Sequence, residues 1–277
     1  MTNIASSEAN LGAAVHAPAD DRSGLVLGAR ILFLLVILTL WQGAVAVGLA
    51  SPAFVSTPLS VAQSLWLLFS GGEVFPNLGT TMLEILIAFL LSIVFGVASA
   101  IVLDRMDWLN RVVSPFLTAF NSMPRIALGP LFILWFGIGI ASKVVLAFSL
   151  GYFIMLLSTL GGLKNVDRDL LLMSRLFGAS EIGLFRHVRL PWALPGIFAG
   201  LKLTLIYCSA GAVIGEMIAA KSGLGVLLQS FSGRFDVAGV MALILIVALM
   251  VMAVTSLMDL AERRLLRWSK GSTDVPG

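Results

Sequence analysis

Six stretches of the sequence are apolar for about 20 residues or more, which is the length a helix needs to cross a bilayer. They cover residues 26–49, 80–103, 112–136, 142–163, 197–220 and 237–258. Inside a bilayer the backbone must satisfy its own hydrogen bonds, and a helix does so within a single segment. The sequence therefore predicts an all-α polytopic membrane protein with about six transmembrane helices.

The composition excludes the main soluble alternatives. Hydrophobic residues make up 58% of the 277 positions and charged residues only 12%, whereas a soluble domain is usually about 45–50% apolar. The net charge of +3 does not indicate a nucleic-acid partner, because basic residues accumulate in the cytoplasmic loops of membrane proteins. We therefore expect membrane lipid, and no nucleic acid, among the partners.

The third predicted span, 112–136, is the least regular of the six. Pro115, Pro124 and Pro130 would each disturb a helix, and the charged Arg125 lies among them. Proline removes a backbone donor and clashes with the preceding turn. We expect a bent or broken helix here.

The lysines and arginines between the spans are strongly biased to one side. Thirteen lie in segments on the side of the termini: Arg22, Arg30, Arg105, Arg111, Lys164, Arg168, Arg175, Arg186, Arg189, Arg263, Arg264, Arg267 and Lys270. The opposite loops hold only Lys143, Lys221 and Arg234. By the positive-inside rule both termini are predicted to be cytoplasmic.

The longest predicted cytoplasmic loop, residues 164–196, has the signals of two short helices. Asp167 can cap the first helix, and Gly178 supplies its stop. Ser180 can cap the second, and Pro191 is expected to end it. Each helix has an apolar side, which the residues Leu170, Leu171, Met173, Leu176, Phe177, Ile182, Phe185 and Val188 form. Such a pair suits either a groove on a partner protein or the headgroups of a lipid surface.

The sequence "FGASEIGLFRHVRLPWALPGIFAGL" in this loop resembles the cytoplasmic signature of the permease subunits of binding-protein-dependent ABC importers. The segments "SPFLTAFNSMPRIALGPLFILWFGIG", "GEMIAAKSGLGVLL" and "ERRLLRW" resemble the sulfonate, nitrate and taurine branch of that family. The likeness covers about residues 25–268. The signature often begins with Glu-Ala-Ala, but this chain has Leu172, Met173 and Ser174 there, and Asp169 is only a weak substitute.

The resemblance implies a type I ABC importer permease fold and a prokaryotic inner-membrane location. The implied parts are a cytoplasmic tail at 1–24, a permease domain at 25–268 and a C-terminal tail at 269–277. The loop would be a coupling helix that contacts an ATP-binding cassette ATPase subunit, through Arg175, Phe177, Gly178, Ala179, Ser180, Val188, Leu190 and Pro191.

The other implied partners are a second permease subunit, identical in this branch, and a periplasmic or lipid-anchored substrate-binding protein. Residues 50–79 and 221–236 are the surfaces that such a binding protein would contact. Gly223 and Gly225 indicate a tight turn into a short helix within the second of these surfaces. The implied substrate is a small anion such as a sulfonate, taurine or nitrate.

No sequence motif for catalysis is present, so we expect no enzyme activity, no catalytic residue and no cofactor. The phosphate-binding motif G-x-x-x-x-G-K-[ST] is absent, which leaves ATP hydrolysis to a partner subunit. His16 and His187 are far apart in sequence and are not spaced as metal ligands. The lone Cys208 lies in an apolar run and is expected to be a packing residue.

Four ionisable residues fall within predicted spans: Glu84, Arg125, Lys202 and Glu216. Such residues are costly in a bilayer and are functional candidates by default. Glu84, Arg125 and Glu216 are candidates for the transport pathway, where Arg125 could attract an anion. The structural alternative for the two glutamates is a pair with Arg125, a bond to nearby backbone, or exposure at the membrane surface. Lys202 is expected to be an anchor at the cytoplasmic end.

Two small-x-x-x-small patterns, Gly211/Gly215 and Ser92/Gly96/Ala100, permit close helix packing; packing within one subunit is the favoured reading. Two other protein classes remain. An ion-gradient-driven secondary transporter would show an inverted repeat and paired carboxylates, and neither is evident in the sequence. A purely structural scaffold would not explain the loop at 164–196.

Overall fold

The computed structural model describes residues 22–49 and 51–266. The predicted tails, apart from residues 22–24, lie outside the described residues, as do His16, Arg267 and Lys270. The described chain divides between Val61 and Ala62 into two compact units. The first contains α2 (Arg22–Ala46), α3 (Pro52–Val55) and the start of α4 (Pro58–Ser70).

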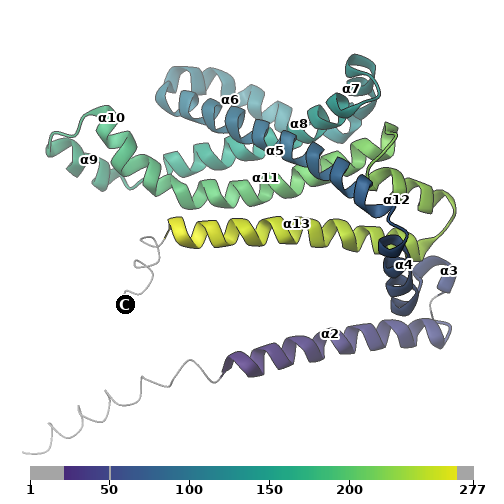
Figure 1. Cartoon of the computed structure of the whole chain (residues 1–277). Helices are drawn as coiled ribbons and strands as arrows, with labels where there is room; N and C mark the ends of the chain where they lie inside the picture. The colour runs from purple at the N-terminus through teal and green to yellow at the C-terminus, as the bar shows by residue number, and fades with distance from the viewer. Residues whose placement is uncertain (1–21, 50, 267–277) are drawn as a thin grey trace, which may run out of the picture. The chain divides into compact units, whose positions relative to one another are not determined.

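The second unit holds the rest of α4 and all later elements (Figure 1). These are α5 (Val74–Arg105), α6 (Asp107–Ser122), the 3-10 helix η1 (Arg125–Leu128), α7 (Gly129–Phe136), α8 (Ile140–Lys164), α9 (Arg168–Leu176), α10 (Glu181–Leu184), the π-helical turn η2 (Phe185–Arg189), α11 (Leu190–Ala219), α12 (Leu224–Gly233) and α13 (Val237–Leu265). No strand occurs in the part of the chain that the structure describes.

The prediction of an all-α membrane protein is confirmed. Within the described residues, five helices are long and apolar enough to cross a membrane, and there are six if the bent pair of α6 with η1 and α7 is one span. The two arms of that pair meet at 81°. The predicted break in the third span is thus present. It falls at Met123 and Pro124, whereas Pro115 lies inside an unbroken α6 and Pro130 in the first turn of α7.

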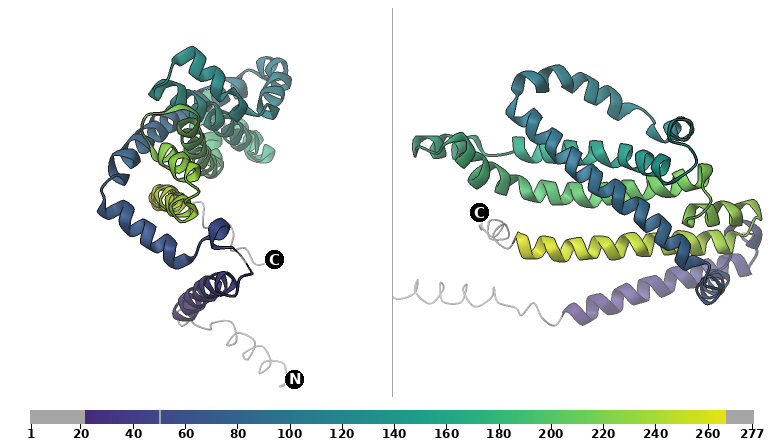
Figure 2. Two further views of the ribbon diagram at one scale, coloured as in Figure 1. Left: turned by 90° about the vertical axis from the view of Figure 1, so that its right-hand side faces the viewer. Right: turned by 45° about the horizontal axis from the view of Figure 1, so that its top comes forward.

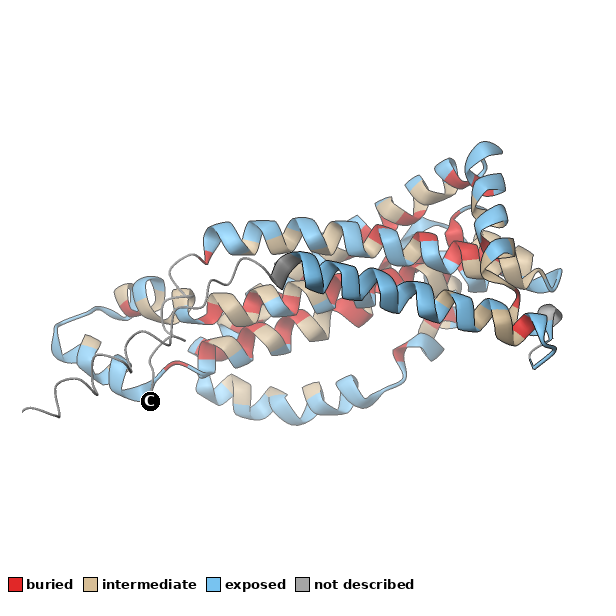
Figure 3. Ribbon diagram, turned by 90° about the horizontal axis from the view of Figure 1, so that it is seen from below, coloured by how far each residue is buried: buried red, intermediate tan, exposed pale blue. Residues whose placement is uncertain are grey.

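Helix α8 is at the centre of the second unit. Half of its most apolar segment is buried, against 28% for α5 and for α13. Figures 1 and 2 show α8 beside α11, with α5 crossing both helices. Buried residues accordingly concentrate on the facing sides of these helices (Figure 3).

Glycines allow the backbones of α5, α8 and α11 to approach closely. A Cβ atom at Gly96 would lie 2.8 Å from Cβ of Met155, and one at Gly211 would lie 2.7 Å from Cα of Ala147. Both glycines therefore pack against α8 of the same chain, as the favoured reading of the small-residue patterns predicted. In lipid, where hydrophobic transfer does not bring helices together, this close packing is a main source of helix association.

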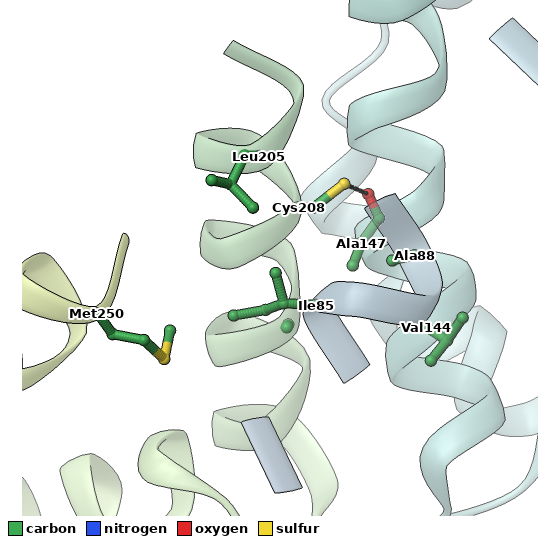
Figure 4. Packing of buried hydrophobic residues seen from close by; sticks show 8 residues of the cluster. Ile85, Ala88, Val144, Ala147, Leu205, Cys208 and Met250 are labelled. Atoms are coloured by element: carbon green, nitrogen blue, oxygen red, sulfur yellow. Dashed lines mark hydrogen bonds between the residues drawn. The ribbon is translucent and has the colours of Figure 1, made fainter. Parts of the chain in front are cut away.

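Cys208 lies within this contact (Figure 4). It is fully buried, and its thiol lies 3.6 Å from the carbonyl oxygen of Ala147. Around it pack side chains from four helices, among them Ile85 of α5, Val144 of α8 and Met250 of α13. Its position confirms the prediction that it is a packing residue.

The prediction that Pro191 ends a helix is wrong. The chain is helical without a break from Glu181 to Ala219. Pro191 lies in the first turn of α11, directly after the π-helical turn η2, where the amide of Leu190 bonds to the carbonyl of Phe185 five residues earlier. A wider turn accommodates a residue that has no backbone N–H to donate.

We predict that Gly151→Leu destabilises the fold and that Gly161→Leu, in the same helix, does not. A Cβ at Gly151 would lie 2.7 Å from Oγ of Ser92, whereas nothing lies within 4 Å of one at Gly161. Overpacking of this kind costs about 1–3 kcal/mol. Thermal unfolding in detergent should show a lower melting temperature for Gly151→Leu alone; equal melting temperatures would contradict the central position of α8.

Candidate functional site

Both helix starts predicted between α8 and α11 are capped as expected, although the second one opens the long continuous helix Glu181–Ala219. The carboxylate of Asp167 accepts a hydrogen bond from the amide of Asp169 at the start of α9. The hydroxyl of Ser180 accepts one from the amide of Gly183 at the start of α10. Between the helices Gly178 has a φ of 81°, a left-handed conformation that a glycine adopts without strain. The sharp turn at Gly178 follows directly from these residue types.

Large apolar side chains stand exposed at this turn. Leu176 is 87% and Phe177 86% exposed, and Leu172, Met173 and Ile182 are also exposed. Arg175 and Glu181 form an exposed ion pair of 3.1 Å across the turn. An exposed apolar cluster with a charged border is typical of a surface that binds a partner.

A cavity of about 520 Å³ lies beside the turn, between the ends of α5 and α8 and the segment 171–189. Its polar wall includes Asp104, Lys164 and Arg189. Asp104, whose side chain is 1% exposed, accepts two hydrogen bonds from Arg189, of 2.8 and 3.1 Å. Bidentate arginine–carboxylate pairs fix orientation as well as distance, so this pair ties η2 to the end of α5.

The structure brings together only some of the predicted coupling residues. Arg175, Phe177, Gly178, Ala179 and Ser180 follow one another through the exposed turn. Val188 of η2 and Leu190 and Pro191 of α11 are partly buried.

Two of the predicted pathway residues meet at the opposite end, near α12. Glu84 of α5 and Glu216 of α11 are 0% and 1% exposed. Glu84 forms an ion pair with Lys143 of α8, and Lys143 also packs against Gly215, the residue before Glu216. Of the three structural alternatives, the pair with Arg125 is not formed and neither glutamate reaches the surface, whereas Glu216 does bond to nearby backbone. Paired carboxylates are not evident in the sequence, yet the fold brings two together.

Glu216 also has partners of its own. One carboxylate oxygen accepts a hydrogen bond of 2.7 Å from the hydroxyl of Thr81, and the other accepts one of 2.7 Å from the amide of Gly225. Lys143 is buried in the first turn of α8 rather than exposed in an outer loop, which corrects its predicted place. The sequence does not show which of the three basic residues predicted in outer loops, Lys143, Lys221 or Arg234, would be buried.

Arg125 lies at the break between α6 and α7 and is 9% exposed. Its guanidinium donates to the backbone carbonyls of Phe120 and Asn121 on α6 and of Ser149 and Leu150 on α8. It also lies 4.3 Å from the ring of Phe153. Five donors in a planar fork suit such a cluster of acceptors, and the arginine thereby holds the broken span against α8.

Lys202 lies in α11 and pairs with Asp259 and, at 2.5 Å, with Glu262 of α13. The residue predicted as an anchor to the headgroups therefore bridges two helices. Within residues 22–49 and 51–266, no three His, Cys, Asp or Glu side chains are grouped in a way that could hold a metal ion.

Residues 92–267 match the family model described as the binding-protein-dependent transport system inner membrane component. The chain belongs to this family. It is 33% identical over 236 residues to the riboflavin transport system permease protein RibX of Chloroflexus aurantiacus, covering 85% of this chain and 88% of RibX. It is 32% identical over 233 residues to the putative aliphatic sulfonates transport permease protein SsuC of Escherichia coli, covering 84% and 89% of the two chains.

The fold is that of a solved permease. A chain of the MetNI methionine ABC transporter, in an inward-facing conformation, superposes with a TM-score of 0.61 at 21% identity, covering 72% of this chain and 96% of that one. The resemblance seen in the sequence is confirmed, and so is the expected fold. This chain is a multi-pass permease component of an ABC importer.

Three residues of the permease that form these contacts were not singled out from the sequence as members of a site: Thr81, Asp104 and Lys143. Each makes its contact with a residue at least 59 positions away along the chain. Asp104 and Lys143 each lie at the end of an apolar run, where a charge ordinarily means the membrane surface. The neighbouring residues alone do not show that these two charges are buried.

We predict that Asp104→Asn destabilises the permease and frees the segment 168–189. The change leaves Arg189 with a weaker partner in a partly buried site, at a cost of about 1–3 kcal/mol. Glu181→Gln, which breaks the exposed pair with Arg175, should cost about 1 kcal/mol or less. Thermal unfolding and limited proteolysis in detergent would measure both effects, and equal proteolysis of the two variants would contradict the role of the Asp104–Arg189 pair.

Proposed function

We propose that this permease forms, with a second identical copy, the pathway through which a small anion enters the cell. ATP hydrolysis in a separate ATP-binding cassette subunit drives the transport. A soluble or lipid-anchored binding protein delivers the substrate on the other side of the membrane. Both termini and the loop 164–196 face the cytoplasm.

The observation that carries the proposal is the exposed turn between α9 and α10. Leu176 and Phe177 are almost fully exposed there, outside any of the helices that are long enough to span a membrane. Their exposure supports a docking surface for the ATPase subunit, which the coupling residues Arg175, Phe177, Gly178, Ala179, Ser180, Val188, Leu190 and Pro191 would serve. The amphipathic alternative, contact with lipid headgroups, remains the competing explanation for the same side chains.

The proposed sidedness is supported by the burial of Lys143. Because Lys143 lies inside the bundle, only Lys221 and Arg234 remain as basic residues in the outer loops, and the bias that predicts cytoplasmic termini becomes larger.

The substrate is the least constrained part of the proposal. RibX is named for riboflavin and SsuC for aliphatic sulfonates. Two permeases that are about equally similar to this chain are thus named for different substrates. A sulfonate, taurine or nitrate remains our first choice. The pathway role of Glu84, Arg125 and Glu216 stays a prediction, and their internal partners favour a structural role for each.

One observation favours a second candidate, an ion-gradient-driven transporter. Glu84 and Glu216 form the kind of buried carboxylate pair that such a protein would use. Their position weakens this candidate, because they lie beside α12 at one end of the bundle and are joined to structural partners.

The test is to tag the chain, solubilise its membranes gently and identify the copurifying proteins by mass spectrometry. Recovery of an ATP-binding subunit would support the importer, and the binding protein that accompanies it could then be screened with sulfonates, taurine, nitrate and riboflavin. Recovery of the chain alone, with uptake that an ionophore stops and ATP depletion does not, would establish the second candidate.

We predict that Gly178→Val abolishes copurification of the ATPase subunit and transport, while the spans remain folded. Valine is strained at a φ of 81° and would reshape the turn. Gly178→Asn is the matched control, since asparagine tolerates the left-handed conformation and should retain the subunit. Nothing lies within 4 Å of a Cβ at this position, so a loss caused by packing is not expected. Normal transport by Gly178→Val would contradict the docking role of the loop.

A further inference from the structure

The first turn of α12 is held by side chains from two transmembrane helices. Three consecutive amides are bound: Gly223 donates to the side chain of Asn77 at 2.7 Å, and Leu224 to the hydroxyl of Thr81 at 2.9 Å. Gly225 donates to Glu216 at 2.7 Å. The first amides of a helix lack partners within it, and here α5 and α11 supply all three acceptors.

Thr81 is the centre of this arrangement. Its hydroxyl accepts from α12 and donates to Glu216 at 2.7 Å, with the carbonyl of Asn77 as a second acceptor at 3.0 Å. Thr81 is fully buried. A single hydroxyl, buried away from bulk solvent, therefore joins α5, α11 and α12.

The start of α12 packs closely against α11. A Cβ at Gly225 would lie 2.7 Å from Cβ of Glu216, and Gly223 has a φ of 123°. Leu224 is fully buried beneath the turn. We call Asn77, Thr81, Glu216 and the amides of residues 223–225 the α12 anchor.

Stability alone is a poor explanation for the charges beside this anchor. A buried ion pair is often no more stabilising than apolar residues of the same size. Glu84, Lys143 and Glu216 are nevertheless all buried together. Buried polar groups of this kind are costly unless their geometry is well satisfied, so they favour one arrangement of the helices over others.

The far end of α12 presents an exposed pair of residues. Phe235 is 85% exposed and has a φ of 57°. This backbone conformation is strained for a bulky residue, and such strained residues cluster at functional sites. Arg234 beside it is exposed and lies 5.4 Å from the ring of Phe231. An aromatic ring next to an arginine suits a partner surface that is apolar with an acidic border.

We propose that Thr81 and Glu216 are positioning residues, which fix α12 to α5 and α11 so that Arg234 and Phe235 meet the binding protein at a defined place. The proposal rests on the proposed function for the identity of that partner. The anchor makes α12 move with the outer halves of the two spans. Docking of the binding protein on α12 is thereby linked directly to the helices that form the pathway.

The first experiment compares Thr81→Val with Thr159→Val by hydrogen exchange and mass spectrometry on the intact complex. Both changes replace a buried hydroxyl by a methyl group, but the hydroxyl of Thr159 has no partner among the described residues. Amide exchange in residues 221–236 should become about tenfold faster or more in Thr81→Val and stay unchanged in Thr159→Val. Thr81→Ser, which keeps the hydroxyl, should restore protection. Unchanged exchange in Thr81→Val would overturn the anchor.

The second experiment measures ATP hydrolysis by the same complexes in lipid discs against the concentration of binding protein. The half-saturating concentration should rise about tenfold for Thr81→Val, because docking must then order α12. Phe235→Ala should raise it with no change in exchange, and Thr159→Val should leave it as in the wild type. A role in folding alone would lower the maximal rate and leave the half-saturating concentration unchanged, which would overturn the positioning role.

The two measurements separate this proposal from the proposed function. A wild-type complex that no soluble partner stimulates would contradict the importer function and, with it, the docking role of α12. The exchange comparison would still decide the anchor, because it needs no binding protein.

Discussion

The close approach of α8 to α5 and α11 is the contact on which the other features depend. In lipid there is little hydrophobic gain from bringing helices together, and small residues that allow backbone contact take its place. At Gly96, Gly151 and Gly211, atoms of the neighbouring helices occupy the space that a Cβ would need. The packing of these three helices brings Arg125, Asp104 and Glu216 within hydrogen-bond distance of their partners. The broken third span, for example, is held by the bonds of Arg125 to carbonyls of α8.

Buried charge marks both ends of this bundle. At the end near α9, Asp104 binds Arg189; at the end near α12, Glu84 pairs with Lys143 and Glu216 binds the amide of Gly225. Charges without partners would be costly in these places, so each set is satisfied only when its helices are correctly placed. The pairs therefore specify where the loop 164–196 and α12 attach. On the proposed function, these attachments are the two places where partner proteins meet the permease.

What the sequence predicts well is local. The six apolar runs gave the spans, Asp167 and Ser180 gave the helix caps, and Gly178 gave the turn, because each depends on neighbouring residues alone. The burial of Lys143 could not be predicted, since its partner Glu84 is 59 positions away. The prediction for Pro191 is wrong for a different reason. A proline usually stops a helix, but the wider π-helical turn before Pro191 accommodates its ring and its missing N–H donor. The role of Thr81 depends on three helices at once and leaves no pattern in the sequence.

The continuity of the helix past Pro191 has a mechanical consequence. Residues 181–219 form one helix, which at about 1.5 Å per residue is long enough to cross a bilayer and extend beyond it. It begins at the exposed turn, carries Arg189 near one end and ends three residues after Glu216. A break at Pro191 would have separated residues 181–190 mechanically from the span. Because the helix is continuous, a displacement of its first turns is passed on to α11 and, through Glu216, to the α12 anchor. On the proposed function, a single helix thus connects the ATPase surface with the surface for the binding protein.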